Sequence, residues 1–144
     1  MLIMAFDAGT KRIGVAVGDE NLPIASPVCC LENDGALGKK VKKLLEEYNP
    51  GKILIGNPIS LDGTERKKDF VEAFKNEIRE LAGDREVIMW DERFTSRDAE
   101  EILIKADVSR KKRKKYVDKL AAVIILRSYL DSAGCRRANE RKKQ

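Results

Sequence analysis

The 144-residue chain carries 42% apolar and 37% charged residues, which is typical of one soluble domain with a full core. It contains no histidine, which excludes zinc sites that need imidazole and nucleophiles that a histidine activates. Any catalysis must therefore use carboxylates, lysines, hydroxyls or a metal ion bound by oxygen. No apolar run in the sequence approaches the ~20 residues of a membrane span.

The first segment of the chain predicts two strands joined by a tight turn. Residues 2–6 are all apolar and lead to Asp7, and a second apolar run follows over residues 13–17. Gly9 supplies the flexible backbone that so short a reversal needs. The turn brings a hydroxyl and two cations beside the acid: Thr10, Lys11 and Arg12. A carboxylate fixed beside cations can bind a metal ion and a phosphate together, whereas the simpler alternative is an ordinary polar turn.

The remaining segments alternate between strands and helices. Apolar runs predict three more strands, over Pro23–Leu31, Lys52–Gly56 and Glu86–Trp90. Apolar residues at helical spacing predict helices over Gly35–Tyr48, from Phe70 to Gly83, from Thr95 to about Lys105, and from Ser109 to about Ser132. The first three strands should form an antiparallel meander, and the later two should lie parallel to the first.

The predicted fold class is therefore α/β, a five-stranded mixed sheet with helices on both faces. One domain should cover residues 1–135, and the basic tail over residues 136–144 should fray. Three cysteines without metal-ligand spacing favour a reducing cytoplasm: Cys29, Cys30 and Cys135.

Positive charge is concentrated at the C-terminal end of the chain. Residues 110–144 hold 13 Lys/Arg against 3 Asp/Glu, whereas residues 1–109 hold 16 against 21. Six consecutive cations dominate this segment: Arg110, Lys111, Lys112, Arg113, Lys114 and Lys115. At the start of a helix they oppose the macrodipole, so the run is destabilising there. This arrangement favours binding of a nucleic-acid backbone over a merely solvated helix start.

Acids from distant segments are predicted to meet at one edge of the sheet. Asp7 ends the first strand, Asp91 and Glu92 follow the last, and Asp118 interrupts an apolar helix face. Each has a structural alternative, respectively a turn, a solvated strand exit and an ion pair with a nearby cation. Their convergence favours one or two Mg²⁺ or Mn²⁺ ions, which prefer oxygen ligands. Such ions can clamp the attacking and leaving oxygens of a phosphodiester.

Four motifs occur in order along nearly the whole chain. They read FDAGTKRIGVAV from Phe6, IGNP from Ile55 with a following DGT, DERFTS from Asp91 and VDKLAA from Val117. Together they resemble the YqgF-type family of Holliday junction resolvase-like proteins, whose members are also described as pre-16S rRNA nucleases. Asn57 and Gly18 depart from the residues usual in that family, and neither change removes an expected metal ligand.

The resemblance implies a ribonuclease-H-like fold and a metal-dependent nuclease that matures the 5′ end of 16S rRNA. By position, it implies that the catalytic and metal-binding acids are Asp7, Glu92 and Asp118, with Mg²⁺ or Mn²⁺ as cofactor. Asp91 is the alternative to Glu92. The predicted nucleic-acid-binding residues are Thr10, Lys11, Arg12, Arg93 and the six cations of residues 110–115.

Three other functions remain open at this point. The chain could resolve branched DNA, or it could bind nucleic acid through a vestigial site without cleaving it. The segment from Asp7 to Thr10 also resembles the phosphate loop of actin-like ATPases, which need a second domain that 144 residues cannot supply. Structured RNA is favoured over branched DNA because the helix stripes leave no spare face for a symmetric dimer, so a monomer is expected.

Overall fold

The computed structural model describes residues 1–8, 12–58, 65–92, 120–130 and 132. In chain order its elements are β1 (Leu2–Ala8), β2 (Arg12–Asp19), β3 (Leu22–Glu32), α1 (Leu37–Tyr48), β4 (Lys52–Pro58), α2 (Glu65–Ala82) and β5 (Glu86–Glu92). Residues 120–130 form a further helix inside the span predicted for the last one. The helix predicted over residues 95–105 and the tail over 136–144 lie outside the described residues, so the domain boundary stays a prediction.

The strands form one mixed sheet in the order β3-β2-β1-β4-β5. β1 pairs antiparallel with β2, and β2 pairs antiparallel with β3. β4 lies parallel to β1 on one side and to β5 on the other. The predicted meander and the predicted parallel strands are thus confirmed. Because β1, β4 and β5 are parallel, their carboxyl ends lie at the same end of the sheet. We call this end, where β1 finishes with Asp7 and Ala8, the Asp7 edge, and we call the other end of the strands the opposite edge.

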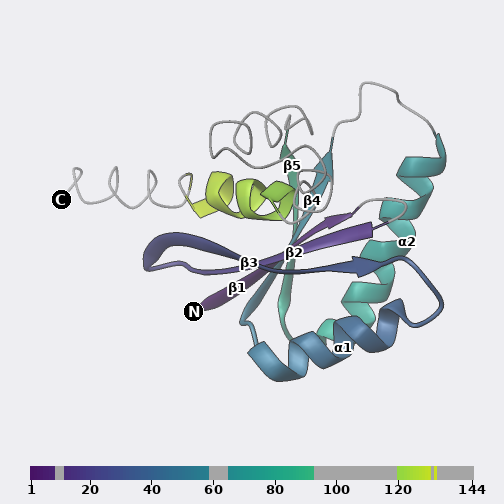
Figure 1. The fold of residues 1–144 in the computed structure, drawn as a ribbon, viewed down its shortest axis with the longest axis horizontal. Coiled ribbons are helices and arrows are strands. Elements are labelled where there is room, and N and C mark those ends of the chain that lie inside the picture. Colours follow the sequence, from purple (N-terminus) through teal and green to yellow (C-terminus); the bar gives the residue numbers. More distant parts are fainter. Residues whose placement is uncertain (9–11, 59–64, 93–119, 131, 133–144) are drawn as a thin grey trace, which may run out of the picture.

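Helices cover both faces of the sheet, as predicted (Figure 1). β1, β2 and β4 are nearly continuous apolar runs because both of their faces are buried, whereas the described side chains of the outer strands β3 and β5 are partly buried or exposed. Along β1, Met4 and Phe6 face α1 and α2, whereas Ile3 and Ala5 face the helix of residues 120–130. The first face is packed with larger residues, and the Phe6 and Phe74 rings meet edge to face at 5.8 Å.

The ends of several elements differ from the expected ones. β4 and β5 each continue two residues beyond the predicted ranges, because Asn57 pairs with Asp91 and Pro58 pairs with Glu92. The two acids therefore belong to the strand itself rather than to the loop after it. α1 begins at Leu37 rather than at Gly35. No helix within the described ranges is long and apolar enough to cross a membrane.

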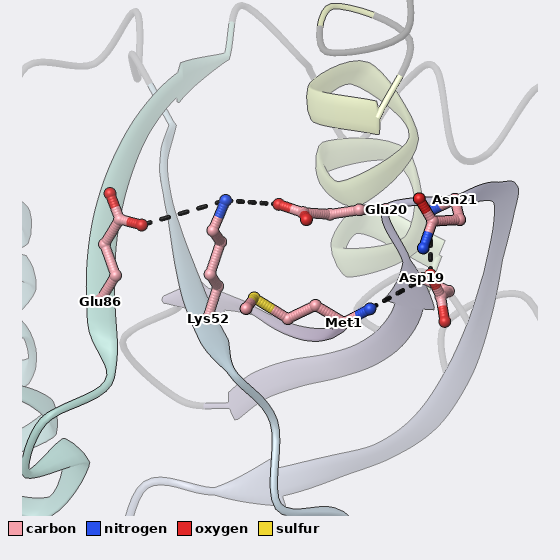
Figure 2. Close-up of polar contacts among 6 residues, drawn as sticks. All are labelled: Met1, Asp19, Glu20, Asn21, Lys52 and Glu86. Carbon is pink, nitrogen blue, oxygen red and sulfur yellow. Dashed lines mark hydrogen bonds and ion pairs between the residues drawn. The ribbon is translucent and has the colours of Figure 1, made fainter.

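A cluster of ion pairs holds together the opposite edge of the sheet (Figure 2). Lys52, the first residue of β4, donates a hydrogen bond to Glu20 and lies 4.0 Å from a carboxylate oxygen of Glu86. The amino group of Met1 lies 3.5 Å from Oδ1 of Asp19. The cluster thus joins the amino ends of β1, β4 and β5 to the turn between β2 and β3.

We expect Lys52→Met to lower the free energy of unfolding by about 1.5 kcal/mol at pH 7, since it leaves the partly buried Glu20 without its charged partner. The Glu20 hydrogen bond raises the pKa of Lys52 above its usual 10.5. The stabilisation is therefore complete below pH 10.5 and is lost as the pH rises through the raised pKa. Urea unfolding of both proteins should show a difference that shrinks above pH 10.5.

Lys40→Met is the matched control for this prediction. Lys40 also makes an ion pair, with Asp34 at 3.0 Å, but both side chains are more than one-third exposed. Exposed pairs contribute little, so the expected loss of stability is much smaller than that of Lys52→Met. Equal losses in the two variants, or a Lys52→Met loss independent of pH, would contradict this interpretation of the cluster.

Candidate functional site

Asp7 is the penultimate residue of β1 and lies at the Asp7 edge. It follows Ile3 and Ala5 in the alternation of the strand, so it belongs to the face covered by the helix of residues 120–130. Its side chain is partly buried, whereas the residues before it on this face are fully buried. The carboxylate thus lies where the packed interior meets the edge of the sheet.

Glycine flanks Asp7 on both neighbouring strands. Asp7 pairs with Gly14 of β2 and with Gly56 of β4, and both glycines are buried. Neither glycine has a side chain to occupy the face beside the carboxylate. Above Gly56 the space belongs to Ile125, because a Cβ at position 56 would lie 3.1 Å from Ile125 Cγ1 and closer still to its Cδ1. Gly56 therefore lets the helix of residues 120–130 approach the sheet directly beside Asp7.

A tryptophan at the end of the same row fixes this helix to β5. Trp90 pairs with Gly56, and its indole Nε1–H donates a hydrogen bond to Oγ of Ser128 at 3.3 Å. Its ring meets Tyr129 edge to face, with 5.4 Å between the centroids. Trp90 and Ile125 thus anchor the helix at two points on the row that contains Asp7.

β5 brings a second acid to the Asp7 edge. It is separated from β1 only by β4, so the backbones of β1 and β5 lie about 10 Å apart. Glu92 is the last residue of β5 and stands two positions beyond Trp90 in the strand. The fold thus brings the backbones of two predicted acidic positions, 7 and 92, to one edge.

The other predicted residues divide between described and undescribed parts of the chain. Arg12 is the first residue of β2 and is exposed. The following predicted residues lie outside the described residues: Thr10, Lys11, Arg93, the run 110–115 and Asp118. Within the described ranges, no three acidic or cysteine side chains gather in a way that could bind a metal ion. The sequence analysis did not identify Gly14 and Gly56 as neighbours of Asp7, because only the strand register reveals this.

Comparisons with known proteins agree with this architecture. The sequence profile of the RuvX family, described as Holliday junction resolvase, matches residues 1–132. A Bacillus cereus (strain G9842) protein named "Putative pre-16S rRNA nuclease" is 42% identical over 137 residues, which span 92% of this chain and 99% of that protein. A Bacillus cytotoxicus protein of the same name is 43% identical over the same shares.

Solved structures share the fold at low sequence identity. Thermus thermophilus RuvC, in complex with a Holliday junction substrate, superposes with a TM-score of 0.57 at 14% identity, over 92% of this chain and 95% of that one. The fowlpox virus Holliday junction resolvase gives 0.54 at 17% identity, over 92% and 99%. The fold is therefore that of the ribonuclease-H-like resolvases, as the sequence motifs implied. Because the family profile matches residues 1–132 and the two Bacillus relatives are 42% and 43% identical, this chain belongs to the RuvX family.

Proposed function

We propose that this chain is a metal-dependent nuclease that hydrolyses phosphodiester bonds at the 5′ end of precursor 16S rRNA. Membership of the RuvX family and the names of the two Bacillus relatives support a nuclease. The observation that carries the proposal is the setting of Asp7, a partly buried carboxylate between two glycines. It lies at the edge where β5 ends with Glu92.

The proposed catalytic acids are Asp7, Glu92 and Asp118. Position 92 falls in the same alternation of β5 as Ile88 and Trp90, which pack on the face that carries Asp7. Position 91 falls in the opposite alternation, which supports Glu92 over Asp91. Asp118 stands four residues before Ala122 and seven before Ile125, the spacing of one helix face. Both of those residues pack against the sheet on the face of Asp7, which supports Asp118 as the third acid.

The residue set fits a divalent cation. Carboxylates are the ligands that Mg²⁺ and Mn²⁺ prefer, and the chain has no histidine that would favour zinc. Gly14 leaves the face on one side of Asp7 without a side chain of its own, whereas Ile125 fills the space over Gly56 on the other side. When bound, such an ion would polarise the scissile phosphate and lower the pKa of the attacking water. The three acids would hold the ion and orient that water against the phosphorus atom.

Cations around the edge would bind the neighbouring phosphates of the substrate. Arg12 is exposed at the start of β2, one strand from Asp7, which supports this role. We propose the same role for the residues predicted from the sequence: Thr10, Lys11, Arg93, Arg110, Lys111, Lys112, Arg113, Lys114 and Lys115. Charge-assisted contacts to phosphate position a substrate without reading its sequence.

We favour RNA over branched DNA because a resolvase that cuts two strands symmetrically needs a stable two-fold dimer. Such an interface requires exposed apolar surface, and the apolar stripes of α1 and α2 are buried against the sheet. Among the described residues, Met1 and Leu22 are the large apolar residues that are mostly exposed, at 57% and 56%. A single cut per monomer agrees with trimming of one RNA strand.

Depletion of the protein in cells should cause 16S precursors with unprocessed 5′ ends to accumulate. Purified protein with Mn²⁺ should cut a transcript that spans this end, and EDTA should stop the reaction because the proposed acids act only with a bound cation. A four-way DNA junction assayed in parallel tests the resolvase alternative. Normal 16S ends on depletion, with paired symmetric cuts in the junction by a dimeric protein, would establish that alternative instead.

A further inference from the structure

The N-terminal half of α1 lies at the Asp7 edge, although α1 covers the face opposite to Asp7. The chain enters α1 from β3, whose last residue, Glu32, pairs with Arg12 at the start of β2. The chain leaves α1 for Lys52, which pairs with Ile3 at the opposite edge of the sheet. α1 therefore runs from the Asp7 edge to the opposite edge (Figure 1).

Four of the first seven residues of α1 are lysines, and three of them are free of carboxylates. Lys40 makes an ion pair with Asp34 at 3.0 Å. Lys39, Lys42 and Lys43 are exposed and make no ion pair within the described part of the chain. At 100° per residue these three lie within about 100° of one another around the helix. We call them the α1 lysine stripe.

The charges of α1 are arranged against its own stability. Its first turn contains no acid and its last turn contains no base. The lysines occupy the positive end of the helix dipole, and Glu46 and Glu47 occupy the negative end. Lys39 and Lys43 also repel each other at a spacing of four residues. Folding alone does not account for this order of charges.

Two nearby acids relieve only part of this cost. Asp34 accepts a hydrogen bond from the backbone N–H of Ala36 and forms an ion pair with Lys40. Its negative charge is therefore balanced by Lys40 rather than by the α1 lysine stripe. Glu77 of α2 reaches the first turn of α1, where its Oε1 would lie 2.6 Å from a Cβ at Gly38. Neither acid forms an ion pair with the α1 lysine stripe, so its positive charge faces solvent.

The backbone of α2 also begins towards the Asp7 edge. It follows β4, which ends at the Asp7 edge, and it leads into β5, which begins at the opposite edge. Its first turn therefore lies near the Asp7 edge, and three of the first four residues of α2 are Arg66, Lys67 and Lys68. In sequence, both helices on this face thus begin with cations, and the backbones of their first turns lie towards the Asp7 edge.

We propose that the α1 lysine stripe binds backbone phosphates of the nucleic-acid substrate at a distance from the cleaved bond. The proposal rests on the proposed nuclease function and extends it, since it adds a second basic surface on the face opposite to the helix of residues 120–130. The partner is a polyanion because exposed lysines on one side of a helix match spaced phosphates without reading bases. The substrate would therefore pass over the Asp7 edge and continue along α1.

The test compares Lys39→Gln/Lys43→Gln with Lys75→Gln/Arg79→Gln in the full-length protein. Both double variants remove two cations spaced by four residues, and the second pair lies in the C-terminal half of α2, far from the Asp7 edge. The probes are a fluorescent fragment of the 16S precursor and a version shortened by about ten nucleotides, roughly 34 Å of strand. Binding is measured in EDTA at several salt concentrations, and cleavage with Mn²⁺ is measured separately.

The first variant should bind the long probe more weakly, with a log–log salt slope reduced by about 1.4–1.8 for two lost contacts. Its loss of affinity should be smaller for the short probe, and its melting temperature should be no lower than that of the wild type. The control should keep the wild-type slope. An unchanged slope in Lys39→Gln/Lys43→Gln, with a wild type that cuts the probe, would overturn the lysine stripe alone. A reduced slope without cleavage by the wild type would support the surface and refute the nuclease.

Discussion

Replacing Asp7 by asparagine should abolish cleavage and leave the free energy of unfolding unchanged or higher. Loss of a group that merely supports a metal ligand costs roughly 10–100-fold, so loss of a proposed ligand should exceed about 100-fold. Asparagine keeps the shape of the side chain and removes a charge that repels the other proposed acids in the absence of a cation. Single-turnover cleavage of the precursor transcript measures the effect.

Asp19→Asn is the matched control for this experiment. Asp19 ends β2 at the opposite edge, where it accepts a hydrogen bond from the backbone N–H of Asn21 at 2.9 Å and pairs with the amino group of Met1. It should keep wild-type activity, since it lies far from the Asp7 edge. Full activity of Asp7→Asn, in a preparation free of contaminating nuclease, would refute the assignment of Asp7.

A readout without substrate distinguishes an active site from a vestigial one. A cation that binds only the folded protein raises its melting temperature in proportion to the logarithm of its concentration. Mn²⁺ should therefore raise the melting temperature of the wild type and of Asp19→Asn, but not that of Asp7→Asn. A wild type that does not respond to Mn²⁺ or Mg²⁺ would favour the nucleic-acid-binding module without catalysis.

The sequence predicted the sheet well because its central strands, β2, β1 and β4, are buried on both faces. Such strands appear as short unbroken apolar runs, and the connections between them set parallel or antiparallel pairing. The runs did not show where pairing stops: β4 continues to Pro58 and β5 to Glu92, since strand pairing does not require apolar side chains. For the same reason, positions 91 and 92 belong to β5 rather than to a loop. The alternation of a strand assigns these two positions to opposite faces of the sheet.

Local side-chain hydrogen bonds explain the late start of α1. Helical spacing suggested Gly35 as its first residue, but Asp34 accepts a hydrogen bond from the N–H of Ala36 at 2.9 Å. This short turn occupies the position where the helix would otherwise begin. Leu37 is thus the first helical residue, and its side chain is the first of the buried stripe.

The surroundings of Asp7 could not be predicted from the sequence. Gly14 and Gly56 are separated from Asp7 by 7 and 49 positions, and only the register of two strand pairs brings all three together. If either pairing shifted by one residue, Asp7 could pair with Ile13 or with Ile55 in place of a glycine. An isoleucine side chain would then lie beside the acid. Motif and spacing pointed to Asp7 as a candidate acid, whereas its neighbours on the sheet depend on long-range pairing.

Gly56→Ala should lower the free energy of unfolding by about 1–3 kcal/mol, the usual cost of overpacking a core. In a strand, alanine would otherwise be favoured over glycine by roughly 0.5–1 kcal/mol, so the sign of the effect is diagnostic. The new Cβ would lie 3.1 and 3.2 Å from Ile125 Cγ1 and Cγ2 and closer to Cδ1, so the helix of residues 120–130 must move away. Because Asp118 precedes this helix by two residues, we expect cleavage to fall at least tenfold in a protein that still folds, as a misplacement of about 1 Å can cost 100-fold.

Gly38→Ala and Ile125→Val make this prediction specific. At Gly38 a Cβ would meet only the flexible end of Glu77, so alanine in this helix should stabilise the protein by up to about 1 kcal/mol. Ile125→Val removes Cδ1, the atom nearest to the new Cβ, and should restore much of the stability and activity lost in Gly56→Ala. A double-mutant cycle of positions 56 and 125, followed by urea unfolding and by single-turnover cleavage, should therefore show a favourable coupling of more than about 0.5 kcal/mol. Additive losses in the cycle, or a Gly56→Ala protein as stable and active as the wild type, would show that the close approach of this helix does not set the geometry of the site.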